Sequence, residues 1–198
     1  MHEPWFYALW TTGAYLLGSV SAGDLVARMA GVNIRRLGDG NPGTVNIYRE
    51  VGPIYGIAVL ALDVATGAAA TLPLYILDSP MWLRVLAVVA VLGGHIFPVF
   101  WKFSGGAGGA VGMGATFGLM PLGALIAAPV TILAIALVRT PIFSVWLFFG
   151  VTLLAGGILH RDPASVGAVL LAMAVPTMKF LVQRGINSVA ALKRALGL

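Results

Sequence analysis

Long runs of hydrophobic residues dominate this chain, and short polar segments separate them. A helix needs roughly 20 apolar residues to cross the hydrocarbon core of a bilayer, and most of the runs are close to that length. The pattern therefore predicts an all-α, polytopic transmembrane helical bundle. The runs are Trp5–Ala30, Pro53–Leu77, Met81–Phe100, Ala110–Val138, Phe143–Leu159 and Pro163–Val182.

The fourth run differs from the others, because its length of about 29 residues exceeds what one span requires. Pro121 and Pro129 lie inside it together with Gly118 and Gly123, and these residue types break or kink helices. Two short spans, over about 108–121 and 123–138, explain the run better than one long helix. The chain is then expected to have about seven spans.

The positions of the basic residues support an odd number of spans. With the N-terminus outside, every Lys and Arg except Arg84 and Arg161 lies on the inside, which is the usual bias of membrane proteins. With six spans, Arg184, Lys193 and Arg194 would move outside and weaken the bias. We therefore expect a cytosolic C-terminus, a location in the inner (plasma) membrane, and a single transmembrane domain over residues 1–198.

The composition excludes several other classes of protein. The chain is 59% hydrophobic and only 10% charged, whereas a soluble domain is roughly 25% charged. It has no cysteine, so disulfides, thiolate metal sites and a cysteine nucleophile are excluded. The formal net charge of +5 does not gather into a dense patch, so we expect it to reflect membrane topology and not nucleic-acid binding.

The two ends of the chain carry weaker signals. Met1–Pro4 provides no positively charged segment before the first apolar run, so we expect a retained helix and not a cleaved signal peptide. In Asn187–Leu198, Val189, Leu192 and Leu196 recur at helical spacing beside two cations. This spacing predicts a short amphipathic helix along the inner interface.

The first inside loop combines glycine, asparagine and arginine in an otherwise apolar chain. It contains Arg35, Arg36 and the pattern Gly-x-Gly-Asn-x-Gly-x-x-Asn. Glycines allow positive φ, so that successive N–H groups converge on an anion, and guanidinium groups bind phosphate bidentately. The pattern favours a phosphate or acyl-phosphate cradle, although a basic loop that only fixes topology would also explain the arginines. Its residues are Gly38, Gly40, Asn41, Gly43 and Asn46.

The second inside loop is rich in glycine. Gly105, Gly106, Gly108 and Gly109 precede a predicted helix, an arrangement that suits anion binding at the helix N-terminus, with Lys102 as a nearby cation. A glycine-rich turn between helices is the alternative. The loop lacks the Gly-Lys-Ser/Thr ending of a nucleotide-binding P-loop.

Two acidic residues and a histidine lie inside or at the ends of the apolar runs. Asp63 is within a span, where an ionisable group is costly and indicates either a functional site or a structural partner of Arg35 or Arg49. Asp24, near the inner end of the first run, is likewise either part of a functional site or a structural partner of an arginine. His95 is either a base or a residue that holds the loop by a hydrogen bond.

Polar residues also occur at two further inside edges. Ser144 follows Arg139, and Asn187 follows Arg184. Four inside segments could therefore converge on one polar site at the membrane surface, which a hydrophobic substrate tail would enter from between the helices.

These loops resemble those of the integral-membrane glycerol-3-phosphate acyltransferases that use acyl-phosphate as donor, and the order and spacing of motifs match over nearly the whole chain. The family's Gly-Ser-Ile-Pro-x-Gly corresponds to Gly18–Gly23. Its first-loop pattern, Ile-Arg-x-x-Gly-Ser-Gly-Asn-x-Gly-Ala-Thr-Asn-x-x-Arg, is matched by Ile34, Arg35, Gly38, Gly40, Asn41, Gly43, Asn46 and Arg49. Its second-loop pattern is matched by Gly94, His95, Phe97, Pro98, Val99, Phe100, Phe103, Gly105, Gly106 and Gly108.

The chain also departs from the family. Three family lysines are replaced by Thr66, Ser104 and Ala107. The late family serine is matched by Ser144 only after a shift. The family's His-x-x-Asn becomes Arg184–Asn187, where Arg184 could restore one of the lost cations.

The resemblance implies acyl transfer from acyl-phosphate to the 1-hydroxyl of glycerol 3-phosphate, which gives lysophosphatidic acid at the cytosolic membrane face. We expect His95 and Arg49 as catalytic residues, although a substrate phosphate oxygen could serve as the base and Arg35 could stabilise the departing phosphate instead. Ser144, Arg184 and Asn187 are expected as substrate ligands together with the loop residues named above. We expect no cofactor and no metal, the two substrates and membrane lipid as partners, no nucleic acid, and a monomer. A different acceptor, a non-catalytic lipid-binding role and a small transporter stay open.

Overall fold

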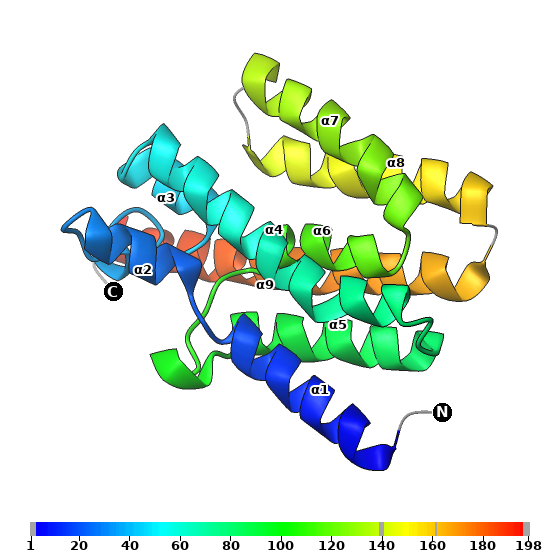
Figure 1. Cartoon of the computed structure of the whole chain (residues 1–198). Coiled ribbons are helices and arrows are strands. Elements are labelled where there is room, and N and C mark those ends of the chain that lie inside the picture. The colour runs from blue at the N-terminus through cyan, green and yellow to red at the C-terminus, as the bar shows by residue number, and fades with distance from the viewer. Residues whose placement is uncertain (1–2, 139–140, 161, 196–198) are drawn as a thin grey trace.

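All regular secondary structure in the described part of the chain is helical, as the all-α class requires. A computed structural model describes residues 3–138, 141–160 and 162–195, and these ranges contain no strand. The α-helices (Figure 1) are α1 Pro4–Gly18, α2 Ala22–Met29, α3 Thr44–Glu50, α4 Pro53–Ile76, α5 Met81–Ile96, α6 Gly109–Ala115, α7 Pro121–Val138, α8 Pro141–His160 and α9 Pro163–Ala195. The 3₁₀ turns are η1 Ile34–Arg36, η2 Val99–Trp101 and η3 Thr116–Gly118.

The lengths and composition of the helices support a membrane protein. Within the described residues, four segments are long and apolar enough to cross a bilayer, and Phe143–Leu159 is a shorter apolar helix. The four are Pro53–Ile76, Met81–Trp101, Pro121–Val138 and Pro163–Val182. The beginning of α1 and the end of α9 lie at opposite ends of the bundle (Figure 1), as an odd number of crossings requires. The number of seven spans and the orientation of the termini in the membrane stay predictions.

The first apolar run is broken, which the sequence did not predict. Helix α1 ends at Gly18 and α2 begins at Ala22. Ser19 Oγ donates to the carbonyl oxygen of Tyr15 at 2.9 Å, and Ser21 Oγ accepts from Asp24 N at 3.3 Å and thereby caps α2. Serine side chains that bond to nearby backbone favour helix ends over helix interiors, which explains the break.

The fourth run divides as expected, close to the predicted position. Helix α6 and turn η3 end at Gly118, and α7 begins at Pro121 and continues through Pro129. Helix α6 has 7 residues, so it is only about 10 Å long and does not cross a bilayer by itself. This half of the run is therefore shorter than the span that was predicted.

The end of the chain also differs from the prediction. Helix α9 has 33 residues and continues to Ala195 without a separate amphipathic helix. Pro176 lies within this helix and does not end it. The predicted tail is thus an extension of the last span, and residues 196–198 lie outside the described residues.

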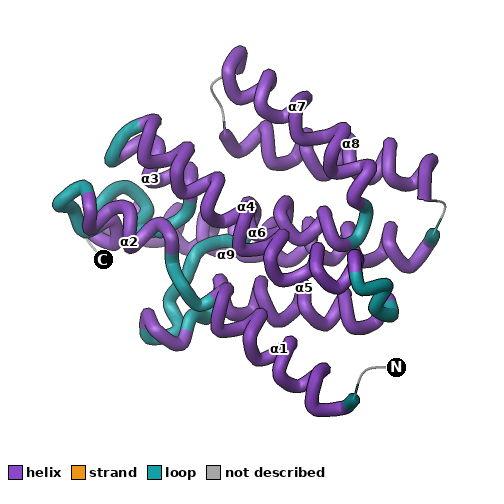
Figure 2. Tube along the Cα trace, in the orientation of Figure 1, coloured by secondary structure: helices purple, strands orange, loops and turns teal. Residues whose placement is uncertain are grey.

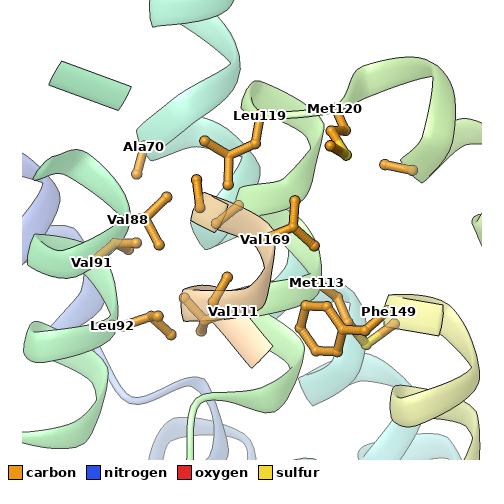
Figure 3. Close-up of a cluster of buried hydrophobic side chains, with 14 of the residues drawn as sticks. Ala70, Val88, Val91, Leu92, Val111, Met113, Leu119, Met120, Phe149 and Val169 are labelled. Carbon is orange, nitrogen blue, oxygen red and sulfur yellow. The ribbon is translucent and has the colours of Figure 1, made fainter. Parts of the chain in front are cut away.

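Close approach of small residues holds the helices together. A Cβ added at Gly67 on α4 would collide with the backbone of Val111, and one at Gly114 on α6 would collide with that of Val64. Around this contact, side chains from α1 and from α4 to α9 form the main core, in which Val88, Val111 and Phe149 are fully or almost fully buried (Figure 3). Because lipid replaces water around such a bundle, backbone proximity takes over much of the role of hydrophobic burial.

The polar loops gather at one end of this bundle. The segments between α2 and α3 and around η2 lie together at the end where α2 and α3 are found (Figure 2). This end also receives the last turns of α9 (Figure 1). The fold therefore brings the two inside loops together, as the sequence predicts.

Candidate functional site

The first inside loop is fixed by the side chain of Asn46. Its Nδ2 donates to the carbonyl oxygens of Leu37 and Asn41 at 3.0 Å each. Its Oδ1 accepts from Asp39 N at 3.4 Å. Gly38 has a φ of 57°, and a Cβ there would collide with this Oδ1. Both amide hydrogens of Asn46 are thus used within the loop, so this residue shapes the loop and does not present donors to a ligand.

Arg35 joins the first loop to α2 and to the second loop. Its Nε and Nη2 donate to the two carboxylate oxygens of Asp24, at 2.8 and 2.7 Å. Its Nη1 donates to Ser104 Oγ at 3.0 Å, and Nη2 also donates to the Ser104 carbonyl oxygen at 2.7 Å. The buried carboxylate of Asp24 is therefore a structural partner of Arg35, one of the two roles that the sequence left open.

The second inside loop lies directly against His95. A Cβ added at Gly106 would collide with Nε2 of the His95 ring, and one at Gly105 would collide with the His95 carbonyl oxygen. Only glycine permits this approach at both positions. The glycine-rich stretch therefore covers His95, and the predicted anion binding by its backbone stays a prediction.

Lys179 on α9 holds this loop from the other side. Its Nζ donates to the carbonyl oxygens of Gly105 and Gly106, at 2.8 and 2.7 Å, and to that of Ile96 at 3.2 Å. Three acceptors satisfy the three hydrogens of an ammonium group. One cation thus ties α9 to the end of α5 and to the glycine-rich loop.

His95 and Asp63 form a buried pair between α4 and α5. Asp63 is on α4 and His95 on α5, and Nδ1 of the ring lies 3.9 Å from Oδ1 of the carboxylate. Both side chains are buried. The separation exceeds hydrogen-bond distance, so the two side chains are neighbours without a hydrogen bond between them. Asp63 therefore partners His95, and not Arg35 or Arg49 as the sequence suggested.

A cavity of about 620 Å³ opens between these elements. It reaches from the first inside loop past His95 to helices α6, α7, α8 and α9. Seven of the residues predicted to be catalytic or to bind substrate line it, from four different segments of the chain. They are Asn41, Gly43, Asn46, Arg49, His95, Gly108 and Ser144.

The cavity has a polar end and an apolar wall. At the polar end, Arg49 is exposed and forms no ion pair with a carboxylate of the described residues. Thr44 Oγ1 is buried and has no hydrogen-bond partner within the described part of the chain. An unpartnered hydroxyl and an unpaired guanidinium that line the same cavity indicate a site for an oxyanion. The apolar wall includes Met113, Phe149, Met173, Pro176 and Phe180.

Comparison with known proteins decides the family. Residues 8–192, most of the chain, match the family model for glycerol-3-phosphate acyltransferase. The chain belongs to the glycerol-3-phosphate acyltransferase family. The resemblance stated from the loop motifs is therefore confirmed.

Curated members of this family share substantial identity with the chain. The glycerol-3-phosphate acyltransferases of Geobacter metallireducens and Aquifex aeolicus are 44% and 38% identical to it over 115 residues, or 58% and 57% of this chain. These matches span 59% of the length of each relative. Glycerol-3-phosphate acyltransferase 2 of Dehalococcoides mccartyi is 32% identical over 169 residues, which is 85% of this chain and 80% of the relative.

Solved structures of the glycerol-3-phosphate acyltransferase family show a similar fold. The crystal structure of PlsY, an integral membrane glycerol 3-phosphate acyltransferase, in its glycerol 3-phosphate form has a TM-score of 0.77 and 26% identity, over 93% of this chain and 92% of that chain. Its lysophosphatidic acid form gives a TM-score of 0.74 and 25% identity over the same shares. The integral-membrane fold is thus common to both proteins.

Some residues predicted to bind substrate lie away from the cavity. Arg35 faces a second cavity on the other side of the loops. Gly38, Gly40, Gly105 and Gly106 shape the loops but do not line the space. Arg184 and Asn187 are on α9, in a part whose side chains are outside the described residues.

Two residues of the candidate site were not recognised from the sequence. Thr44 belongs to the first inside loop, but the buried, unpartnered state of its hydroxyl could not be read from spacing. Lys179 was counted only as an inside cation. The signal for Lys179 was present, because an ionisable residue within an apolar run indicates a specific partner, as it does for Asp63.

Proposed function

We propose that this protein transfers an acyl group from acyl-phosphate to the 1-hydroxyl of glycerol 3-phosphate. The observation that carries the proposal is the amphiphilic cavity. Arg49 and the Thr44 hydroxyl lie at its polar end, and aromatic and methionine side chains form its wall. Such a space suits a donor with an anionic head and a long apolar tail, next to a small anionic acceptor.

The proposed reaction proceeds in one displacement. The 1-hydroxyl oxygen of glycerol 3-phosphate attacks the acyl carbonyl carbon, the bond from this carbon to the phosphate oxygen breaks, and inorganic phosphate leaves. The hydroxyl proton passes to His95, whose ring Asp63 orients. Since phosphate is a good leaving group, no protein nucleophile is required, which suits a chain without cysteine.

The protein contributes position and charge to this reaction. Arg49 and Thr44 bind phosphate oxygens, and Arg49 stabilises the charge that develops on the departing phosphate. Ser144 and the backbone at Gly108 line the same space and bring the two substrates together. Holding the hydroxyl against the carbonyl accounts for much of the expected rate enhancement.

The placement of the site follows from the distribution of basic residues. Arg35, Arg36 and Arg49 belong to the loop that the positive-inside rule assigns to the cytosol. We therefore place the site at the cytosolic face of the inner membrane. The protein acts there as a single-domain monomer that needs no cofactor.

The test is acyl transfer by the purified protein in detergent. Acyl-phosphate and glycerol 3-phosphate are supplied together and singly, and lysophosphatidic acid and phosphate are quantified. Both products should appear in equal amounts only when both substrates are present, and they should fall strongly in Arg49→Ala. Folded protein that forms neither product would refute the proposal.

A different acceptor is the second candidate. Ala107 favours this candidate. It lines the cavity at a position where the glycerol-3-phosphate acyltransferase motif has a lysine. The same assay with a panel of polyol phosphates and neutral polyols separates the two. A higher kcat/KM with another acceptor than with glycerol 3-phosphate would favour this alternative.

A further inference from the structure

A second cavity lies beside α2, away from the proposed acyltransferase site. It has a volume of about 720 Å³ and shares no lining residue with the first cavity. Helix α2, turn η1 and the segment at η2 form its walls. We call it the α2 groove, and the residues used below are Val20, Leu25, Arg28, Phe100, Trp101 and Lys102.

The α2 groove carries an excess of positive charge. Asp24 and Arg35, which also line it, neutralise each other through two hydrogen bonds. Arg28 and Lys102 are exposed, and neither forms an ion pair with a carboxylate among the described residues. Two cations therefore remain to attract an anion.

Trp101 positions one of these cations. The guanidinium carbon of Arg28 lies 4.6 Å from the centre of the Trp101 ring, and that of Arg35 lies 5.5 Å from it. A guanidinium stacked on indole keeps its edge N–H groups free for an oxyanion. Arg28 is thus held in place without its hydrogen-bonding capacity being used by a carboxylate.

Exposed apolar side chains line the groove next to the cations. Val20 is 44% exposed, Leu25 45% and Phe100 61%. On α2 itself, Met29 is 86% exposed beside Arg28, while Val26 and Ala27 are buried. A helix that exposes leucine and methionine together with arginine is unfavourable in water but suits the boundary between headgroups and acyl chains.

We propose that the α2 groove binds one anionic phospholipid of the surrounding membrane. Its phosphate lies between Arg28 and Lys102, and an acyl chain runs along Val20, Leu25 and Phe100. Charge complementarity selects an anionic lipid over a zwitterionic one, because the ammonium of a zwitterionic headgroup would repel the two cations. This site is independent of the acyltransferase proposal, since none of its residues lines the first cavity.

The experiment measures lipid binding by native mass spectrometry of the purified protein in detergent. Phosphatidylglycerol and phosphatidylcholine with the same acyl chains are titrated separately. The wild-type protein should bind phosphatidylglycerol more tightly. Arg28→Gln and Lys102→Gln should each weaken this binding about five-fold, as expected from the effect of one basic residue near an anionic lipid surface.

Arg36→Gln is the matched control. Arg36 is also an exposed arginine of the first inside loop, but it does not line the groove. This variant should bind phosphatidylglycerol like the wild type. Melting curves of all three variants verify folding, and activity of the two groove variants in lipid-free detergent should equal that of the wild type.

Three results would overturn the proposal. Equal affinity for the two lipids would contradict the charge selectivity. An equal loss of phosphatidylglycerol affinity in Arg36→Gln would show that net charge, and not the groove, determines binding. Complete displacement of the lipid by millimolar inorganic phosphate would indicate a simple anion site without a role for the apolar wall.

Discussion

Nδ1 of His95 lies 3.9 Å from Oδ1 of Asp63, in the buried interface of α4 and α5. A carboxylate beside one ring nitrogen favours the tautomer that carries its proton there, which leaves the other nitrogen as the base. In a protein without bound substrate, hydrogen bonds of a catalytic pair are often long and shorten in the substrate complex. The arrangement fits the proposed roles of His95 as the base and of Asp63 as the residue that orients it.

The first prediction concerns this pair. His95→Gln should lower kcat for acyl transfer by about 10²-fold or more, since general-base catalysis contributes about 10²–10⁴-fold. Asp63→Asn should lower it less, because the amide can still orient the ring. Steady-state kinetics in detergent measure both. Wild-type turnover in folded His95→Gln would exclude His95 as the base and leave the departing phosphate as proton acceptor.

The second prediction concerns Arg49, the exposed cation of the cavity. Arg49→Ala should reduce kcat/KM by about 10- to 100-fold, as expected when a charge-assisted hydrogen bond of about 1.5–3 kcal/mol is lost. Arg36→Ala is the control, because Arg36 is exposed but lines neither cavity. If both variants lost activity equally, the effect would be one of net charge and not of a specific contact.

The fold class and the meeting of the two loops could be predicted from the sequence, because they depend mainly on the composition of each segment. Apolar runs of bilayer length predict helices from their own composition, and Pro121 with the nearby glycines favours a break in the long fourth run. The break at Ser19–Ser21 was missed, because a serine in an apolar run either points to the helix backbone or caps a new helix. Tertiary contacts decide between these.

The site was only partly predictable, because residue type does not reveal which partner a side chain meets. The sequence predicts Arg35 as a phosphate ligand, yet its guanidinium donates hydrogen bonds to Asp24 and Ser104. Asn46 likewise uses its donors within its own loop. Arg49 lines the cavity, and no described carboxylate lies near enough to pair with it. Its catalytic role stays a prediction.

The third prediction concerns the glycine that covers His95. Gly106→Ala should strongly lower activity, because its Cβ would collide with the His95 ring and displace either the ring or the loop. Gly93→Ala is the control, because a Cβ at Gly93 meets no atom within 4 Å. It should leave activity unchanged and stabilise α5 by about 0.5–1 kcal/mol. Activity and melting temperature are measured for both, and unimpaired Gly106→Ala would contradict the packing described.

The fourth prediction concerns Lys179. Lys179→Met retains the length of the side chain but leaves three carbonyl oxygens without their donor, so the protein should lose about 1–3 kcal/mol of stability. Thermal and denaturant unfolding in detergent measure the loss. Lys102→Met is the control, because Lys102 is exposed and its replacement should change stability by less than about 0.5 kcal/mol.

The fifth prediction distinguishes two of the replaced lysines. Ala107 lines the first cavity, whereas Ser104 lines the α2 groove. A new cation at Ala107 would therefore face the proposed phosphate site, and Ala107→Lys should tighten glycerol 3-phosphate binding about 10-fold or more, within the range of one charge-assisted hydrogen bond. Ala107→Met, which adds similar bulk without charge, should not tighten it. Calorimetric titration with glycerol 3-phosphate gives both affinities. Equal affinities for the lysine and methionine variants would mean that position 107 does not meet the acceptor phosphate, and the choice of acceptor would then have to be reopened.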